Sequence, residues 1–139
     1  MPKQLFKSGK VVVYVDGGAR GNPGPAAIGV VVGSKEYGEA IGRRTNNQAE
    51  YEAVIFALGK IKQLAGKKAA KEMEVEVRMD SELVVRQLTG RYKILESELQ
   101  PLFLQVWNSK LDFKKADFVH VPREENKAAD RMVNKVLDE

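Results

Sequence analysis

The stretch VVVYVDGGARGNPGPAAIGVVVG, residues 11–33, decides the fold class. Its first part, Val11–Asp16, is rich in β-branched residues and predicts a strand that is buried on both faces. Glycine and proline punctuate Gly17–Pro25, which predicts a loop, and Ala26–Gly33 predicts a second strand. A third strand is predicted at Glu36–Gly42. Three strands joined by short connections indicate an antiparallel meander.

Helical and strand patterns alternate after this meander. Apolar residues recur at helical spacing through Asn46–Leu64, and Thr45 with Gln48 fits a capping box at its start. Met73–Met79 alternates between apolar and charged residues, which predicts a strand, and Gly66–Glu72 before it is predicted to be a loop. The later elements are a short helix, a helix with an inward apolar stripe, a strand and a last helix capped by its first residue: Ser81–Leu88, Leu99–Trp107, Asp117–Val121 and the residues from Asn126 onward. We therefore expect a single α/β domain, residues 1–139, with helices on the faces of a mixed sheet.

The composition excludes several classes of protein and site. The 139 residues contain no cysteine and a single histidine, so a disulfide framework, a thiolate zinc site and a histidine-built metal site are excluded. The longest nearly apolar stretch, Ala26–Gly33, is far shorter than the roughly 18–20 residues of a membrane span. The N-terminal residues also lack the apolar run of a signal peptide. We expect a cytoplasmic monomer without membrane contact, and the net charge of +4 points weakly to an anionic partner.

Four acidic residues stand at the ends of predicted elements. Asp16 and Asp80 each end a strand. Glu50 is expected in the first turn of its helix, and Asp130 in the first turn or so of the last helix. If these ends converge, the result is a cluster of carboxylates that repel one another unless cations bind. Oxygen ligands suit Mg²⁺ or Mn²⁺, and two such ions form a recurring device for cleaving phosphodiesters. If these four acids are set aside, the chain has 23 basic residues and 15 of its 19 acidic ones. This excess of positive charge suits a polyanionic substrate.

Each of the four acids also has a local explanation. Asp16 could open a turn before Gly17, and Asp80 could cap the helix that follows it. Glu50 and Asp130 could answer the dipoles of their helices. No single one of them decides between structure and chemistry.

Four segments together resemble a known family. They are DGGARGNPGP (Asp16–Pro25), TNNQAEYEA (Thr45–Ala53), MDSELVVRQL (Met79–Leu88) and HVPREENKAAD (His120–Asp130). In order and spacing they closely resemble the signature blocks of type 1 ribonuclease H. The resemblance implies the ribonuclease H fold, a five-stranded mixed sheet of order 3-2-1-4-5 whose second strand is antiparallel to the rest.

The resemblance also implies an activity. The family hydrolyses the RNA strand of RNA/DNA hybrids with two Mg²⁺ ions, leaving 5′-phosphate and 3′-hydroxyl ends, and Mn²⁺ is a possible substitute. The residues that match its metal-binding and catalytic carboxylates are Asp16, Glu50, Asp80 and Asp130.

Further positions match the family's substrate contacts. Asn22, Asn46 and Asn47 match residues that touch the minor groove of the hybrid. Arg43 and Thr45 match a pair that grips a phosphate of the DNA strand, although Thr45 is also the predicted helix cap. The backbone around Gly17 and Gly18 can approach a 2′-hydroxyl closely because glycine has no side chain.

Two features depart from the family pattern. Many members carry a histidine in the loop before the last helix, where this chain has Arg123. We expect Arg123 to be an auxiliary catalytic residue; alternatively it binds phosphate or pairs with Glu124 or Glu125. The basic protrusion that some members insert is absent, which leaves Arg91–Lys93 as a small substitute contact, while the lysines between residues 67 and 71 are expected to be solvated.

Two other functions share these observations. A non-catalytic module could bind hybrids on the same scaffold, although it would gain nothing from holding four repelling acids. A DNA enzyme such as a transposase or junction resolvase could share the fold, but these typically lack the GNPGP loop and the asparagines of the TNNQAE block.

Overall fold

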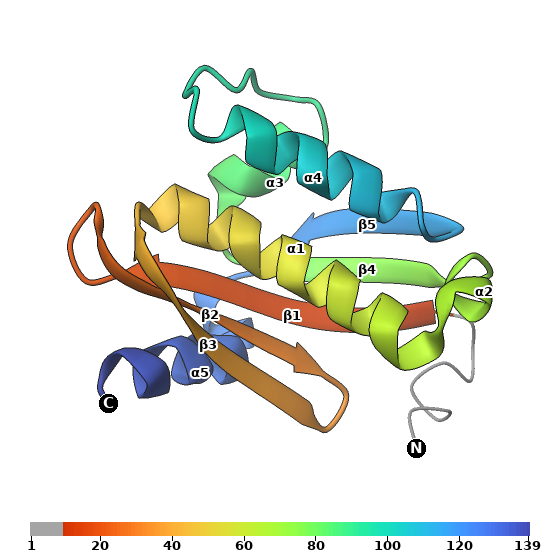
Figure 1. Ribbon diagram of the computed structural model, residues 1–139, viewed down its shortest axis with the longest axis horizontal. Coiled ribbons are helices and arrows are strands. Elements are labelled where there is room, and N and C mark those ends of the chain that lie inside the picture. Colours follow the sequence, from red (N-terminus) through yellow and green to blue (C-terminus); the bar gives the residue numbers. More distant parts are fainter. Residues whose placement is uncertain (1–9) are drawn as a thin grey trace.

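A five-stranded mixed sheet forms the centre of the computed structural model, which describes residues 10–139 (Figure 1). The strand order is β3-β2-β1-β4-β5, as the resemblance predicts. β2 pairs antiparallel with both β1 and β3, whereas β4 runs parallel to β1 and to β5. The strands are β1 (Lys10–Ala19), β2 (Gly24–Val32), β3 (Lys35–Arg44), β4 (Glu74–Met79) and β5 (Lys115–His120).

Helices cover both faces of the sheet. α1 lies along one face with α3 and α4 beside it, and α5 lies on the opposite face against β2 and β3 (Figure 1). The helices are α1 (Asn46–Ala65), α2 (Lys67–Ala70), α3 (Glu82–Leu88), α4 (Gln100–Lys110) and α5 (Lys127–Leu137), and a 3₁₀ turn η2 (Arg123–Glu125) precedes α5.

The core lies between the sheet and α1. Val13 and Val15 of β1 and Val77 of β4 are fully buried, and so are Val54 and Leu58 of α1. Burying each such side chain contributes roughly 1.5–3 kcal/mol. The apolar residues that predict these strands and this helix are therefore the ones that pack the sheet against α1.

The start of α1 confirms the predicted capping box. The Thr45 hydroxyl oxygen accepts the Gln48 backbone N–H at 3.1 Å, and the Gln48 side chain accepts the Thr45 N–H at 2.8 Å. Glu50, however, lies beyond the first turn of α1, which contains no acidic residue. Its position is therefore not explained by the helix dipole, which acts over the first turn.

Three local predictions are wrong. Gly17–Pro25 is not a loop throughout, because Gly17 pairs with Ile28 and the strands of the hairpin reach Ala19 and Gly24. The segment Gly66–Glu72 contains the short helix α2, whose lysines are exposed as expected. Trp107 is 47% exposed on the outer side of α4 rather than part of its inward stripe.

No helix within residues 10–139 is both long enough and apolar enough to cross a bilayer.

Candidate active site

Asp16 lies where β1 and β4 part. The last pair of these strands is Tyr14 with Arg78, while β1 continues beside β2 with Asp16 opposite Gly29. The prediction that Asp16 ends its strand is therefore wrong. Asp16 lies within β1, just past the point where the parallel pairing with β4 ends. Asp80 follows β4 directly at the same edge of the sheet. The carboxyl ends of parallel strands thus bring these two side chains together.

Gly17 brings Glu50 to this edge. A Cβ atom at residue 17 would lie 2.3 Å from the carbonyl carbon and oxygen of Ala49, so α1 can pack here only against a glycine. The Gly17 N–H donates to Glu50 Oε1 at 3.0 Å. The close approach of helix to strand therefore fixes the Glu50 carboxylate beside Asp16.

Gly29 has the matching role on the other face. A Cβ atom at residue 29 would lie 2.2 Å from the carbonyl oxygen of Ala129, so α5 sits directly on β2 opposite Asp16. This contact places Asp130, in the first turn of α5, next to Asp16. Gly29 is not among the residues predicted from the sequence, although an isolated glycine within a strand signals a close backbone approach.

Three of the predicted acids converge tightly. Asp16, Glu50 and Asp80 each offer a carboxylate oxygen within 4.8 Å of the others, and Asp130 joins them through Asp16. Ser81 rather than Asp80 caps α3, since its hydroxyl accepts the Val84 N–H. The cluster opens into a depression of about 360 Å³ whose lining also includes Gly18, Asn46, Arg123 and Asn134.

Burial and repulsion raise the pKa values of two of these acids. The pKa of Asp16 rises from 3.8 to about 8, because the carboxyl is buried and faces the charges of Asp80 and Asp130. Burial, with the charges of Asp16 and Asp80, also raises the pKa of Glu50 well above its usual value. A cluster of hard oxygen donors that resist ionisation without a cation has the chemistry of a divalent-metal site.

Arg123 extends over the cluster from η2. Its Nε lies 3.7 Å from Asp80 Oδ2, and its side chain is 87% exposed. This ion pair is with Asp80 rather than with Glu124 or Glu125, which contradicts one of the alternatives for this residue. The nearby positive charge also opposes the rise in the pKa of Glu50.

Two of the predicted substrate asparagines are hydrogen-bonded to the backbone at the rim. Asn46 Oδ1 accepts the Ala19 N–H at 2.9 Å, and Asn22 Oδ1 accepts the Asn46 N–H at 2.9 Å. These bonds tie the β1–β2 hairpin to the start of α1. They also use an oxygen of each amide and leave the Nδ2 groups as donors. The third asparagine, Asn47, is half-buried beside Asn46.

The predicted phosphate pair lies at the end of β3. Arg43 is exposed and lines a shallow groove with Val136 and Leu137 of α5. The Thr45 hydroxyl uses its oxygen as the helix cap, which leaves its hydrogen available for donation. The two roles considered for Thr45 are therefore compatible.

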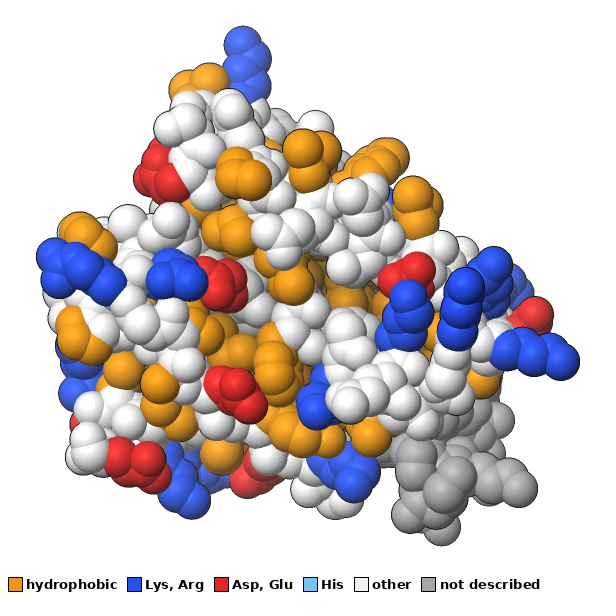
Figure 2. Space-filling view, viewed as in Figure 1, with side chains coloured by type: hydrophobic (Ala, Val, Ile, Leu, Met, Phe, Trp, Pro, Cys, Tyr) orange, Lys and Arg blue, Asp and Glu red, His pale blue; other side chains and the backbone are white. Residues whose placement is uncertain are grey.

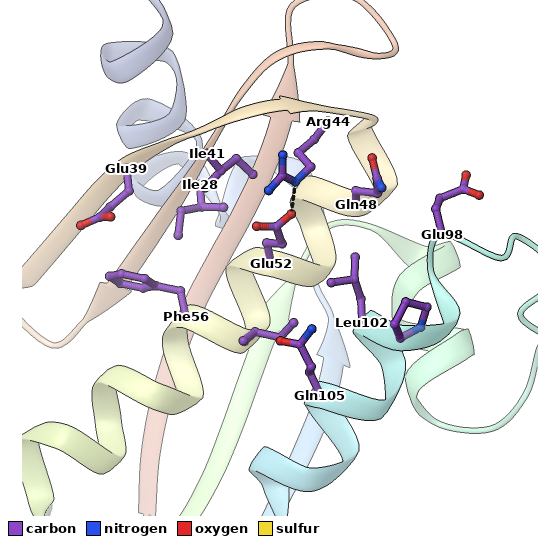
Figure 3. A pocket seen from close by; sticks show the side chains of 12 residues that line it. Ile28, Glu39, Ile41, Arg44, Gln48, Glu52, Phe56, Glu98, Leu102 and Gln105 are labelled. Atoms are coloured by element: carbon purple, nitrogen blue, oxygen red, sulfur yellow. Dashed lines mark hydrogen bonds and ion pairs between the residues drawn. The ribbon is translucent and has the colours of Figure 1, made fainter.

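Arg44 faces the other way. Successive residues of a strand point to opposite faces, and the Arg44 side chain forms an ion pair with Glu52 of α1 (Figure 3). This pair lies in a second hollow of about 450 Å³ between β3, α1 and α4, whose lining includes Ile28, Phe56 and Leu102. Figure 2 shows hydrophobic side chains in this hollow with acidic side chains beside it. Glu52 neutralises the charge of Arg44. Of these two neighbouring arginines at the end of β3, Arg43 is therefore the one that is available to bind a phosphate.

The chain is similar to known proteins over most of its length. The model of the reverse transcriptase-like family matches residues 14–136. Ribonuclease HI of Halobacterium salinarum is 39% identical over 145 residues, covering 98% of this chain and 68% of that protein. A protein of Mycobacterium tuberculosis named as bifunctional is 40% identical over 136 residues, and the chain spans only 36% of its length.

Solved structures resemble the chain over nearly their whole length. LC11 ribonuclease H1, isolated from compost, is 47% identical with a TM-score of 0.86, and the match covers 94% of this chain and 96% of that one. The same ribonuclease has been solved in complex with an RNA/DNA hybrid, with 47% identity and a TM-score of 0.86 over 92% of this chain and 96% of the other.

Proposed function

The chain belongs to the type 1 ribonuclease H family, and on this premise we propose that it is an endoribonuclease that hydrolyses the RNA strand of RNA/DNA hybrids. The observation that carries the proposal is the convergence of Asp16, Glu50 and Asp80 within 4.8 Å, with Asp130 beside them. The hybrid bound by the LC11 relative supports the class of substrate.

The four carboxylates are the proposed holders of two divalent cations, Mg²⁺ or Mn²⁺. When bound, such ions supply a more acidic water nucleophile and stabilise the charge on the leaving oxygen. Asp16 and Asp80 hold their positions from the sheet, and Glu50 and Asp130 from the helices on its two faces. The backbone thus brings the four residues together before any cation arrives, which lowers the cost of ordering the site.

Arg123 is the proposed auxiliary residue. A guanidinium has no proton-accepting atom, so an arginine cannot act as an ordinary general base. Exposed and 3.7 Å from Asp80, it is placed to attract a phosphate toward the carboxylates.

The rim supplies the proposed contacts to the hybrid. The Nδ2 groups of Asn22 and Asn46 are donors, which suits the acceptor atoms that bases present in the minor groove. Asn47, which follows Asn46 in α1, is proposed to touch the same groove, and Gly17 and Gly18 let backbone approach a 2′-hydroxyl. Arg43 and Thr45 at the end of β3 are the proposed grip on a DNA-strand phosphate, since such contacts position a duplex without reading its sequence.

A paired substitution tests the assignment. Asp16→Asn removes a charge from the cluster, whereas Asp117→Asn removes one from an exposed position on β5 and is the matched control. We expect Asp16→Asn to lower the cleavage of an RNA/DNA hybrid in Mg²⁺ on the order of a hundredfold or more. Asp117→Asn should keep the wild-type rate. A near wild-type rate for Asp16→Asn would remove the carboxylate cluster from the mechanism.

A further inference from the structure

The buried side chain of Asn126 holds the strand that carries Asp16. Asn126 is 1% exposed and stands at the N-cap position of α5, yet its side chain makes no cap bond. Instead, its Nδ2 donates to the carbonyl oxygen of Val15 at 2.8 Å. Since that carbonyl belongs to the peptide bond joining Val15 to Asp16, the amide fixes the backbone immediately before the carboxylate.

The backbone of Asn126 reaches two more parts of the site. Its N–H donates to the carbonyl oxygen of Arg123 at 2.9 Å, and its own carbonyl accepts the Asp130 N–H at 3.1 Å. One residue therefore connects β1, the turn that presents Arg123, and the first turn of α5.

In the described part of the chain, only the donor end of the Asn126 amide is hydrogen-bonded. Asn126 Oδ1 is buried and has no hydrogen-bond partner among residues 10–139. A buried oxygen without a donor destabilises a fold, and an apolar side chain of similar size would avoid that loss. What an apolar residue cannot replace is the donor that reaches Val15.

Resting on the function proposed above, we propose that Asn126 is a positioning residue that sets the spacing of Asp16 and Asp130. These two carboxylates repel each other across the junction of β1 and α5. The bond from Nδ2 to Val15 ties the two elements together at the point where that repulsion acts. Asn126 touches neither the substrate nor a cation, and its effect passes through the two acids.

Asn126→Leu tests this role because it removes the donor while keeping most of the volume. Gln87→Leu is the matched control. Gln87, on α3, is the other buried side-chain amide among the described residues, and it accepts a hydrogen bond from the Tyr51 hydroxyl at 2.7 Å. Two readouts are compared at a temperature where all variants are folded: kcat and KM on a hybrid, and the rise in Tm caused by Mg²⁺. The second readout needs no cleavage.

We expect Asn126→Leu to lower kcat by about ten- to a hundredfold with KM nearly unchanged, and to lose most of the Mg²⁺-induced rise in Tm. Gln87→Leu should keep both, even if its Tm falls as far. Wild-type kcat and Mg²⁺ response in Asn126→Leu, or equal losses in Gln87→Leu, would overturn the proposal. If Asn126→Leu does not fold, Asn126→Ser, whose hydroxyl is too short to reach Val15 directly, is held to the same two outcomes.

The Mg²⁺ response separates this inference from the function on which it rests. A wild-type chain that gains stability from Mg²⁺ but cleaves no hybrid would defeat the proposed function. In that case, loss of the Mg²⁺ response in Asn126→Leu but not in Gln87→Leu would still support Asn126 as the positioning residue.

Discussion

Asp16 shows how a single residue can oppose stability in order to support chemistry. Asp16 is 8% exposed, and its buried carboxyl faces two other acids, which raises its pKa to about 8. The folded chain therefore binds a proton more tightly at this position than the unfolded chain does. The stability gained from that proton is complete below the usual pKa of 3.8 and is lost progressively as the pH rises to about 8.

A pH series without metal checks this sign. In chelator, the free energy of unfolding of the wild type should fall between pH 5 and pH 8 relative to that of Asp16→Asn, whose amide carries no charge. The variant should therefore melt at a higher temperature than the wild type at pH 8, and the gap should narrow toward pH 5. Urea unfolding at each pH measures the difference. A pH-independent difference between the two chains would contradict the raised pKa.

At the scale of elements, two glycines seat the helices that carry Glu50 and Asp130. Gly17 packs against the backbone of α1 and Gly29 against the backbone of α5, and each contact is too close to leave room for a methyl group. Gly18, next to Gly17, is different, because a Cβ atom there would meet only the Val133 side chain at 3.5 Å, an ordinary contact.

Alanine at these positions separates seating from chain flexibility. Gly17→Ala and Gly29→Ala should each force a helix away from the sheet and lower both Tm and kcat, with a loss of stability of about 1–3 kcal/mol from overpacking. Gly18→Ala removes the same backbone freedom without the clash, and should keep the Tm close to that of the wild type. Thermal melts and hybrid cleavage provide the comparison. Equal losses in all three variants would show that the close approaches are not what matters.

The same elements show what the sequence could and could not predict. The β-branched runs and the capping box at Thr45 were readable because they depend on local pattern. The ends of the hairpin were not, because Gly17 and Gly18 resemble a loop until Ile28 and Ala27 pair with them. The inward turn of Asn126 was equally hidden, because its local pattern is that of a helix cap.

The convergence of the acids was only partly predictable. Asp80 comes at the end of a strand and Asp130 lies in the first turn of a helix, in the sequence as in the structure. Asp16 lies within a longer strand because β1 stays paired with β2 as far as Ala19 after its pairing with β4 has ended, and that pairing is a property of the sheet rather than of the segment itself. The family resemblance supplied the sheet order that local patterns left open.

At the scale of the whole molecule, affinity and discrimination come from different surfaces. Contacts to phosphates, such as those proposed for Arg43 and Arg123, exist for any duplex and weaken as salt rises. Only contacts to a 2′-hydroxyl distinguish RNA from DNA. We therefore propose that residues 1–139 form a single catalytic domain. It binds hybrid and DNA duplexes alike through charge, but it cleaves only where a ribose lies over the carboxylates.

The most direct measurement is the cleavage in Mg²⁺ of a DNA duplex that carries a short RNA tract in one strand. Cuts are predicted within the tract or at its edge, leaving 5′-phosphate and 3′-hydroxyl ends. Replacing the ribose at the cut site by its 2′-deoxy or 2′-O-methyl form should abolish cleavage there while weakening binding only modestly. Cleavage of an all-DNA duplex at a comparable rate would contradict the account and favour a DNA enzyme on the same fold.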